Sequence, residues 1–411
     1  ILSHFWRKVT SVSVALRTGR MAVGTTRGEA RCRCFGAARA CCGIVVLAGT
    51  FASGVLLSPA FSTALPLLGS RRPLVVRAWA RNESHRNESY HASALEREWT
   101  DTKRAGQICQ TALAQLPRAK IWSAYASAVF KPARQSLREP TAEEEKELSY
   151  FVDAATGQKT FIEPLTGVGR HPMALEAVMC QERVRVPPEG RTHGIQDISY
   201  LIVENFCGRP RPAKSIFFDL GCSVYSSRGL PAPGSDVLDY GKIDISAHAP
   251  SIPLFFNIYR DRCMEFDEIY AWEGQRQDPE IWWRSVPVSL RHKLHFYNAK
   301  VTELSVRDSI AGKEAGHGSF LRMLPLVARP EDYVVLKVDI DFGPELQIVE
   351  AIAARPELYT LVDELFFEYH FRFDGLYFGW QGVEIPGKNV DSAMSLFTRL
   401  RQRGIRAHFW I

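Results

Sequence analysis

Hydrophobic and polar residues follow two different patterns along this chain. From Ala94 to about Leu137 the apolar residues recur at helical spacing, with Pro117 and Pro132 as expected breaks. Residues 141–148, "TAEEEKEL", begin with a threonine followed by acidic residues, which is typical of a helix N-terminus. From about Tyr150 onward, short apolar runs alternate with helical stretches, so a different kind of structure is expected there.

The second part of the chain is predicted to consist of strands that alternate with helices. The apolar runs predict strands at 215–220, 267–273, 293–301, 332–341, 362–371 and 405–411. Helical spacing predicts helices at 251–266, 343–354 and 389–404. This alternation is the signature of an open sheet. We therefore expect an α/β, Rossmann-like domain over residues 150–411, with a mostly parallel sheet and helices on both faces.

An uncharged stretch near the N-terminus has the character of a membrane segment. It covers Ala40–Ser70, and its strongly apolar part, Cys41–Leu57, has 17 residues. That length is at the lower limit of the roughly 17–25 residues that span a bilayer. Arginines crowd the upstream side, which favours a single-pass signal anchor with a cytoplasmic N-terminus. A cleaved signal peptide and an organelle transit peptide are the alternatives.

The anchor divides the chain into parts with different expected locations. These parts are a basic tail (1–39), the membrane segment (40–69), a stem (70–93), a helical region (94–149) and the α/β domain (150–411). Two Asn-x-Ser sequons, at Asn82 and Asn87, fall in the stem and fit glycosylation on the lumenal side of a membrane. We expect a protein of the ER or Golgi membrane with a lumenal C-terminal domain; a secreted or organellar protein is the alternative.

Charge and cysteine content narrow the choice of partners. Residues 1–140 carry 21 Lys and Arg against 7 Asp and Glu, whereas the rest of the chain carries 30 against 38. The basic residues flank an apolar run and are not interleaved with aromatics, so no nucleic-acid partner is expected. The nine cysteines show no zinc-type spacing. A disulfide such as Cys180–Cys207 is compatible with an oxidising lumen.

Polar and charged residues gather where the predicted strands end. They are Asp219 and Gly221 on the first strand, Glu273 on the second, Asp339 and Asp341 on the fourth, and Glu368 and His370 on the fifth. Ligands of open parallel sheets bind beyond the carboxyl ends of the strands. The sequence therefore predicts a binding site at this edge of the sheet.

Each residue type has a use in such a site. A glycine after the first strand lets backbone N–H groups approach a ligand closely. Glu273 at the end of the second strand can accept hydrogen bonds from both hydroxyls of a ribose. His370 or Asp339 is the candidate for a group that takes a proton, because histidine titrates nearest to neutrality.

Several of these stretches resemble known methyltransferases. "FFDLGC" and "YAWEG" resemble the first two motifs of class I methyltransferases that use S-adenosylmethionine (AdoMet), and "VVLKVDIDFGPELQIVEAI" is similar to a segment of the FkbM type. The resemblance covers roughly residues 215–411. It implies AdoMet contacts from Asp219, Gly221 and Glu273, and it matches Asp339 and Glu345 to the later motif. "FIEPLTGVGRHP" and "GIRAHFWI" are also similar to parts of an uncharacterised algal and oomycete family.

The resemblance implies an AdoMet-dependent O-methyltransferase that acts on a glycan or a small metabolite. One alternative is a binding or scaffold domain without catalysis, because Cys222, Ser223 and Val224 stand where the cofactor loop normally has its second glycine. The other is a glycosyltransferase in which Asp339 and Asp341 of "VDID" bind a divalent metal ion.

Overall fold

The computed structural model describes the greater part of the chain beyond the predicted stem. The described residues are 88–101, 108–130, 134–169, 171–172, 197–225, 250–313, 319–341, 343–370 and 385–410. The predicted tail, the membrane segment and both sequon asparagines, Asn82 and Asn87, lie outside them. Among the helices of the described ranges, none has the length and apolar character needed to cross a membrane.

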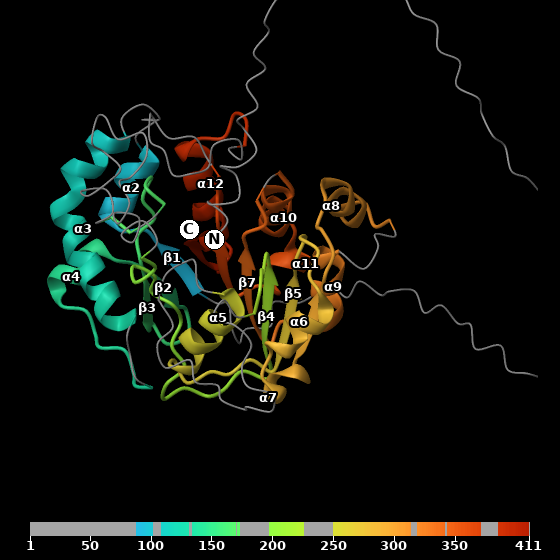
Figure 1. The fold of residues 1–411 in the computed structure, drawn as a ribbon. Helices are drawn as coiled ribbons and strands as arrows, with labels where there is room; N and C mark the ends of the chain where they lie inside the picture. The colour runs from blue at the N-terminus through green and yellow to red at the C-terminus, as the bar shows by residue number, and fades with distance from the viewer. Residues whose placement is uncertain are drawn as a thin grey trace, which may run out of the picture. The chain divides into compact units, whose positions relative to one another are not determined.

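Six parallel strands form the larger sheet (Figure 1). The strands are β4 (Ser215–Leu220), β5 (Glu268–Trp272), β6 (Leu294–Tyr297), β7 (Tyr333–Val338), β8 (Glu364–Phe367) and β9 (Arg406–Phe409). Their order is β6-β5-β4-β7-β8-β9, and all neighbouring pairs are parallel. This is the strand order of a doubly wound sheet, in which the first strand lies near the middle. The prediction of an α/β domain with a mostly parallel sheet is confirmed.

The two central strands explain why these runs of sequence form a sheet. Every residue of β4 and of β7 is buried. Strands that are covered on both faces read as nearly continuous apolar runs, as "SIFFDL" and "YVVLKV" do. Phe217 of β4 stacks on Phe255 and Phe266, with ring centroids 4.8 and 5.2 Å away. Asp219 and Lys337 are the charged exceptions in these two strands, and both belong to the site described below.

Helices connect the strands and cover the sheet. They are α5 (Ser251–Arg260), α6 (Pro279–Arg284), α7 (Val288–Arg291), α8 (Glu303–Ile310), α9 (Phe320–Val327), α10 (Gly343–Ala354), α11 (Pro356–Tyr359) and α12 (Val390–Gln402). α10 packs against α8, α11 and α12, and α8 to α11 gather together on the right of Figure 1. The Asn389 side chain accepts a hydrogen bond from the Ser392 N–H, which caps α12.

The predicted helix at 251–266 is shorter than expected. It ends at Arg260, and the chain then turns through Cys263, whose φ of 63° lies in the left-handed region. A non-glycine residue rarely adopts that conformation without an anchoring contact. Cys263 has one, because its sulfur is bonded to Cys207.

The preceding residues form a second, antiparallel sheet with three helices. β1 (Glu88–His91), β2 (Ser149–Asp153) and β3 (Lys159–Ile162) pair in that order, and α2 (Ala94–Asp101), α3 (Ile108–Phe130) and α4 (Ala142–Glu147) accompany them. β1 lies in the stretch that the sequence assigned to the stem. Trp122 of α3 and Phe409 of β9 belong to one hydrophobic core. The predicted helical region and the α/β domain therefore fold together.

Two expectations for this region had different outcomes. Thr141 caps α4 as predicted, in a reciprocal capping box with Glu144. The break expected at Pro117 is wrong, since α3 continues through it. Twelve of the 23 residues of α3 are buried, among them Trp122. That burial outweighs the roughly 3 kcal/mol that a proline costs inside a helix.

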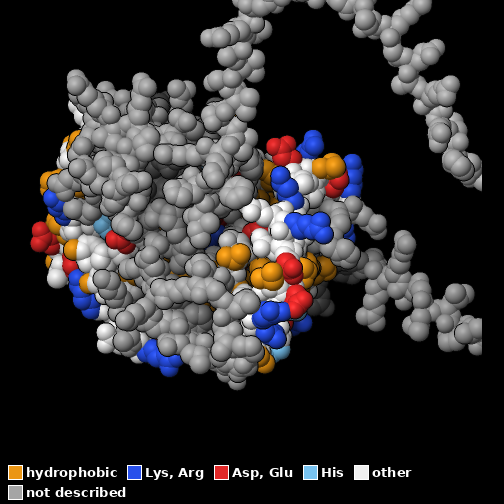
Figure 2. Space-filling view, in the orientation of Figure 1, with side chains coloured by type: hydrophobic (Ala, Val, Ile, Leu, Met, Phe, Trp, Pro, Cys, Tyr) orange, Lys and Arg blue, Asp and Glu red, His pale blue; other side chains and the backbone are white. Residues whose placement is uncertain are grey.

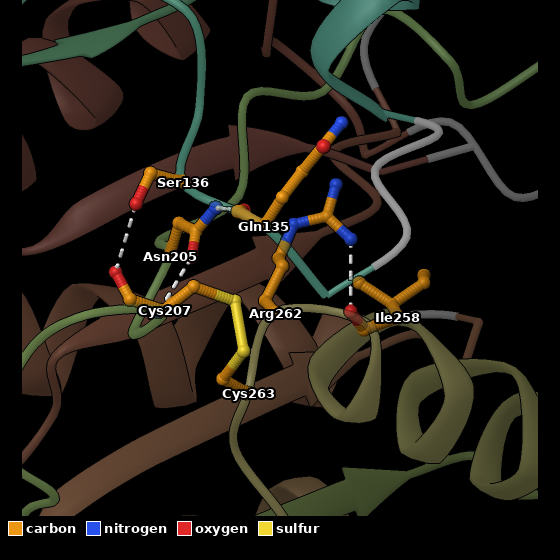
Figure 3. The surroundings of a disulfide bond; sticks show 7 residues. All are labelled: Gln135, Ser136, Asn205, Cys207, Ile258, Arg262 and Cys263. Carbon is orange, nitrogen blue, oxygen red and sulfur yellow. Dashed lines mark hydrogen bonds between the residues drawn. A yellow bond between two sulfur atoms is a disulfide. The ribbon is translucent and has the colours of Figure 1, made fainter.

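A disulfide joins Cys207 to Cys263, which corrects the pairing of Cys207 with Cys180 (Figure 3). The Cα atoms of the two residues are 5.0 Å apart, within the range that a disulfide requires. Asn205 holds the loop in place, because its side-chain oxygen accepts a hydrogen bond from the Cys207 N–H at 2.7 Å. Cys109 is disulfide-bonded as well. Spacing along the chain does not reveal such pairs, because they depend on distances in the folded protein.

Replacing both Cys207 and Cys263 by serine should destabilise the protein by about 2–4 kcal/mol. The bond closes a loop between residues 56 positions apart, and its removal gives the unfolded chain more freedom. Urea unfolding of the oxidised proteins measures the difference. An unchanged unfolding midpoint and slope in the double variant would contradict a stabilising role.

Candidate functional site

The order in which the strands of the larger sheet follow one another along the chain reverses at β4. This strand pairs with β5 on one side and with β7 on the other, both in parallel. In doubly wound sheets, the crevice beyond the carboxyl ends of the strands at such a switch point is where ligands bind. Residues 219–225, 272–275 and 337–341 meet at this place. It contains most of the polar residues that the sequence singled out.

Gly221 lies where the chain leaves β4 and touches the end of β7. Its φ is +95°, and an added Cβ would lie 1.7 Å from the carbonyl oxygen of Asp339. The N–H groups of Gly221 and Cys222 both donate to the carbonyl oxygen of Trp272 at 3.0 Å. The loop is therefore clamped between the ends of β5 and β7. Close packing of the backbone requires a glycine here, in addition to any approach to a ligand.

Glu273 ties the end of β5 to the loop after β4. Its Oε2 accepts a hydrogen bond from the Ser223 N–H at 2.8 Å, and its Oε1 accepts one from the Gln275 N–H at 2.5 Å. The Trp282 indole donates to the Ser223 carbonyl oxygen at 3.2 Å. An ionised carboxylate has about four acceptor positions. Glu273 thus keeps acceptor capacity for two further hydroxyl groups while it orders the loop.

Asp219 and Lys337 face each other across β4 and β7. Asp219 is fully buried; its Oδ1 is 3.5 Å from the Lys337 Nζ, and its Oδ2 accepts a hydrogen bond from the Ser251 hydroxyl. Burial raises the pKa of Asp219, against the opposing effect of Lys337. The Lys337 Nζ also lies 2.8 Å from the Asp339 Oδ2 and donates to the Gly221 carbonyl oxygen at 3.3 Å. Asp219 therefore stabilises the loop from inside the protein, since no part of its side chain is exposed to solvent.

Lys337 was not among the predicted site residues, although it is the cation that joins them. It stands two positions before Asp339 in a strand that is otherwise apolar. A charged residue inside such a run is the signal that could have identified it, because buried charges are nearly always paired. Burial opposes its charge, but Asp339 and Asp219 raise the pKa of Lys337 above its ordinary value.

His370 is held between carboxylates at the end of β8. The ring is fully buried, with Nδ1 2.7 Å from the Glu345 Oε1 and Nε2 3.3 Å from the Glu368 Oε2. Burial disfavours the charged ring, but its contacts with Glu345 and Glu368 prevail and raise the pKa of His370 to about 10. Burial raises the pKa of Glu345 to about 7. In this arrangement His370 carries a proton at neutral pH, which does not suit the role of a base.

Asp339 is the more accessible of the two predicted proton acceptors. Its side chain is 26 % exposed, and its Oδ2 accepts a hydrogen bond from the Trp410 indole at 3.2 Å. Burial and the neighbouring Asp339 carboxylate raise the pKa of Glu368. Burial works against ionisation, but Lys337 holds the pKa of Asp339 below its usual value. Asp339 is therefore ionised and open to the crevice.

The structure brings the predicted residues together in two groups. Gly221 and Glu273 shape the loop on the β5 side. The remaining acids and His370 form a connected cluster at the ends of β4, β7 and β8 and the start of α10: Asp219, Asp339, Asp341, Glu345, Glu368 and His370. Asp339, expected to bind metal together with Asp341 in the glycosyltransferase interpretation, is paired with Lys337, and its metal binding stays a prediction.

Comparison with known proteins assigns neither a family nor a function to this chain. No protein-family model, curated protein or solved structure matches this chain. The function has to be argued from the chemistry of the site itself.

Proposed function

We propose that this protein is an AdoMet-dependent O-methyltransferase that acts on a hydroxyl group of a glycan or a small metabolite. The observation that carries the proposal is the position of Glu273. It ends the strand next to β4 and is hydrogen bonded to the loop that follows β4, beside the switch point. An acidic residue at this place in a doubly wound sheet accepts hydrogen bonds from ribose hydroxyls.

The residues around the crevice are compatible with a nucleoside-type cofactor. Glu273 has acceptor capacity left for the two ribose hydroxyls. The loop after β4 is held next to Glu273, because the Ser223 N–H donates to its carboxylate. Asp219 is buried beneath this loop, so in this proposal it positions Lys337 and Ser251 and does not touch the cofactor.

Asp339 is the residue that would act on the methyl acceptor in the proposed reaction. Bound AdoMet supplies an electrophilic methyl group, and the protein must orient the acceptor hydroxyl and accept its proton. Asp339 is ionised and partly exposed at the end of β7, on the opposite side of β4 from Glu273. Lys337 and the Trp410 indole fix the orientation of its carboxylate. We therefore propose that Asp339, and not His370, accepts the proton of the acceptor hydroxyl.

The charged side chains of the surface and the disulfides bear on the partners and the location in this proposal. Figure 2 shows Lys and Arg side chains interspersed with Asp and Glu on the described part of the visible face. A basic patch typical of nucleic-acid binding is not seen on that face. The Cys207–Cys263 disulfide favours an oxidising compartment. We propose a lumenal domain of the secretory pathway, tethered through residues 40–69.

A scaffold domain without catalysis is the second candidate. It is favoured by the finding that Gly221 and Glu273 both have structural tasks in the loop, which they would retain if cofactor binding had been lost.

AdoMet should raise the melting temperature of the full-length protein. A ligand that binds only the native state adds about 2.7 kcal/mol of stability at a hundred times its Kd. The Glu273→Gln variant should lose this shift, because an amide cannot accept both ribose hydrogen bonds. Differential scanning fluorimetry, with each variant compared to itself without ligand, measures the effect.

The matched control is Glu280→Gln, which alters an exposed acid on α6 and should keep the full shift. If the unaltered protein shows no shift at millimolar AdoMet, the scaffold interpretation replaces the methyltransferase.

A further inference from the structure

We propose that Asp341, Glu368 and His370 form a binding site for one divalent transition-metal ion of the Mn²⁺ type. One ligand atom from each of the three residues lies within 4.8 Å of the others. His370 Nε2 is 3.3 Å from the Glu368 Oε2 and 3.8 Å from the Asp341 Oδ1. Atoms that share an ion at about 2.1 Å lie roughly 3–4.2 Å apart. The two separations from His370 Nε2 therefore suit a common ion.

Glu345 provides a second, independent reason. It comes from α10, outside the three ligands, and its Oε1 lies 2.7 Å from His370 Nδ1. Glu345 is fully buried, and its Oε2 has no hydrogen-bond partner within the described ranges. Histidines that bind metals usually donate their second N–H to a carboxylate, which fixes the tautomer and the ring orientation. Glu345 fits this role, since it directs Nε2 toward Asp341 and Glu368.

The charges around the site also call for a cation. Four carboxylates surround this place, from Asp339, Asp341, Glu345 and Glu368. Lys337 pairs with the Asp339 carboxylate, and His370 is the other cationic group of the cluster. Carboxylates gathered in a largely buried place are costly unless a cation compensates them. A divalent ion bound to His370 Nε2, Asp341 and Glu368 would take the place of the proton that His370 otherwise carries and would add one further positive charge.

The ligand set indicates which ion is preferred. Two carboxylates and one imidazole combine the oxygen ligands that suit Mg²⁺ and Mn²⁺ with a nitrogen ligand that suits transition metals. Ca²⁺ requires six to eight oxygen ligands, which this set does not supply. Among these ions, Mn²⁺ is therefore expected to bind more tightly than Mg²⁺ and Ca²⁺.

The position of the site suggests a role for the ion in binding the methyl acceptor. The Asp341 side chain is 60 % exposed, so one side of the ion would remain open toward the crevice. An oxygen atom of the methyl acceptor bound there would lie near the Asp339 carboxylate, which comes two positions before Asp341 in the chain. This use deepens the proposed function and rests on it. Binding of the ion itself does not.

Mn²⁺ alone tests the site in the full-length protein after treatment with a chelator. Equilibrium dialysis should find one Mn²⁺ per chain, with weaker binding of Mg²⁺ and Ca²⁺ in competition. The Asp341→Asn variant should lower the affinity at least tenfold. Because Asp341 is exposed, this variant is expected to fold normally. Glu345→Gln should lower the affinity 10–100-fold through the orientation of His370.

The control variant is Glu331→Gln, an exposed acid before β7, which should leave Mn²⁺ binding unchanged. The site is refuted if the unaltered protein binds no Mn²⁺ at millimolar concentration, or if Asp341→Asn binds it with unchanged affinity. Equal competition by Ca²⁺ would overturn the assignment of an imidazole ligand. A protein that binds Mn²⁺ but shows no melting shift with AdoMet would refute the proposed function and leave the metal site intact.

Discussion

Replacing Gly221 by alanine should destabilise the protein by about 3–5 kcal/mol, from two costs that add. The first cost is conformational, since a φ of +95° is one that residues with a Cβ rarely adopt. The second is steric, because the new Cβ would lie 1.7 Å from the carbonyl oxygen of Asp339. That neighbour is backbone at the end of a buried strand, so it cannot move aside as a flexible side chain could.

Gly157→Ala is the matched control for the Gly221 variant. Gly157 also has a positive φ, of +71°, but nothing lies within 4 Å of its added Cβ. Only the conformational cost applies there, about 1 kcal/mol. Urea unfolding of the two variants and the unaltered protein separates the costs. Similar losses in the two variants would show that β4 and β7 are not in close contact at Gly221.

The Gly221→Ala variant also bears on the proposed cofactor site. Because the loop after β4 is clamped between β5 and β7, a shift at Gly221 should also move Ser223 and its hydrogen bond to Glu273. We therefore expect any variant protein that still folds to show a reduced melting shift with AdoMet.

Replacing Arg401 by methionine should also lower the free energy of unfolding by about 3–5 kcal/mol, as is usual when one partner of a buried ion pair is removed. Arg401 is fully buried on α12; its Nη1 lies 3.4 Å from the Glu96 Oε2, and its Nη2 lies 3.2 Å from the Glu163 Oε1. It also donates to the carbonyl oxygens of Glu163 and Ala407 at 2.9 and 3.0 Å. Methionine has a similar length but would leave two carboxylates buried beside an apolar chain.

The Arg401 ion pairs are expected to matter because they join distant parts of the chain. Glu96 belongs to α2, Glu163 follows β3, and Arg401 belongs to α12. His408 of β9 extends the network, with Nδ1 2.7 Å from the Glu163 Oε1 and Nε2 2.8 Å from the Glu364 Oε1. The smaller sheet is thus attached to β8 and β9 through buried charges.

Arg284→Met provides the comparison for Arg401. Arg284 pairs with Glu280 one turn away on the exposed side of α6, and exposed pairs of this kind contribute only about 0.3–0.5 kcal/mol. Chemical unfolding of both variants tests the difference. A loss below about 1 kcal/mol for Arg401→Met would indicate that the unpaired carboxylates are readily neutralised or hydrated.

The sequence determined the features that depend on neighbouring residues. The six strands of the larger sheet were located because buried strands read as short apolar runs between turns, and α10 was predicted with its observed bounds. The cap at Thr141 was recognised for the same reason, since its hydrogen bonds involve residues three positions apart. The gathering of acids at the strand ends followed from the parallel order of the strands, because parallel strands bring their carboxyl ends to one edge.

The tertiary structure decided the features that depend on residues far apart in the chain. β1 has no apolar run and pairs with β2 about 60 positions later, so its sequence resembled a stem. Cys207 pairs with Cys263 because the end of α5 comes within reach of its loop. His370 was one of two candidates for the base, but Glu345, 25 positions earlier, lies against its ring and raises its pKa. The charge of a buried group depends on which other charges the fold places beside it, and local sequence does not contain that information.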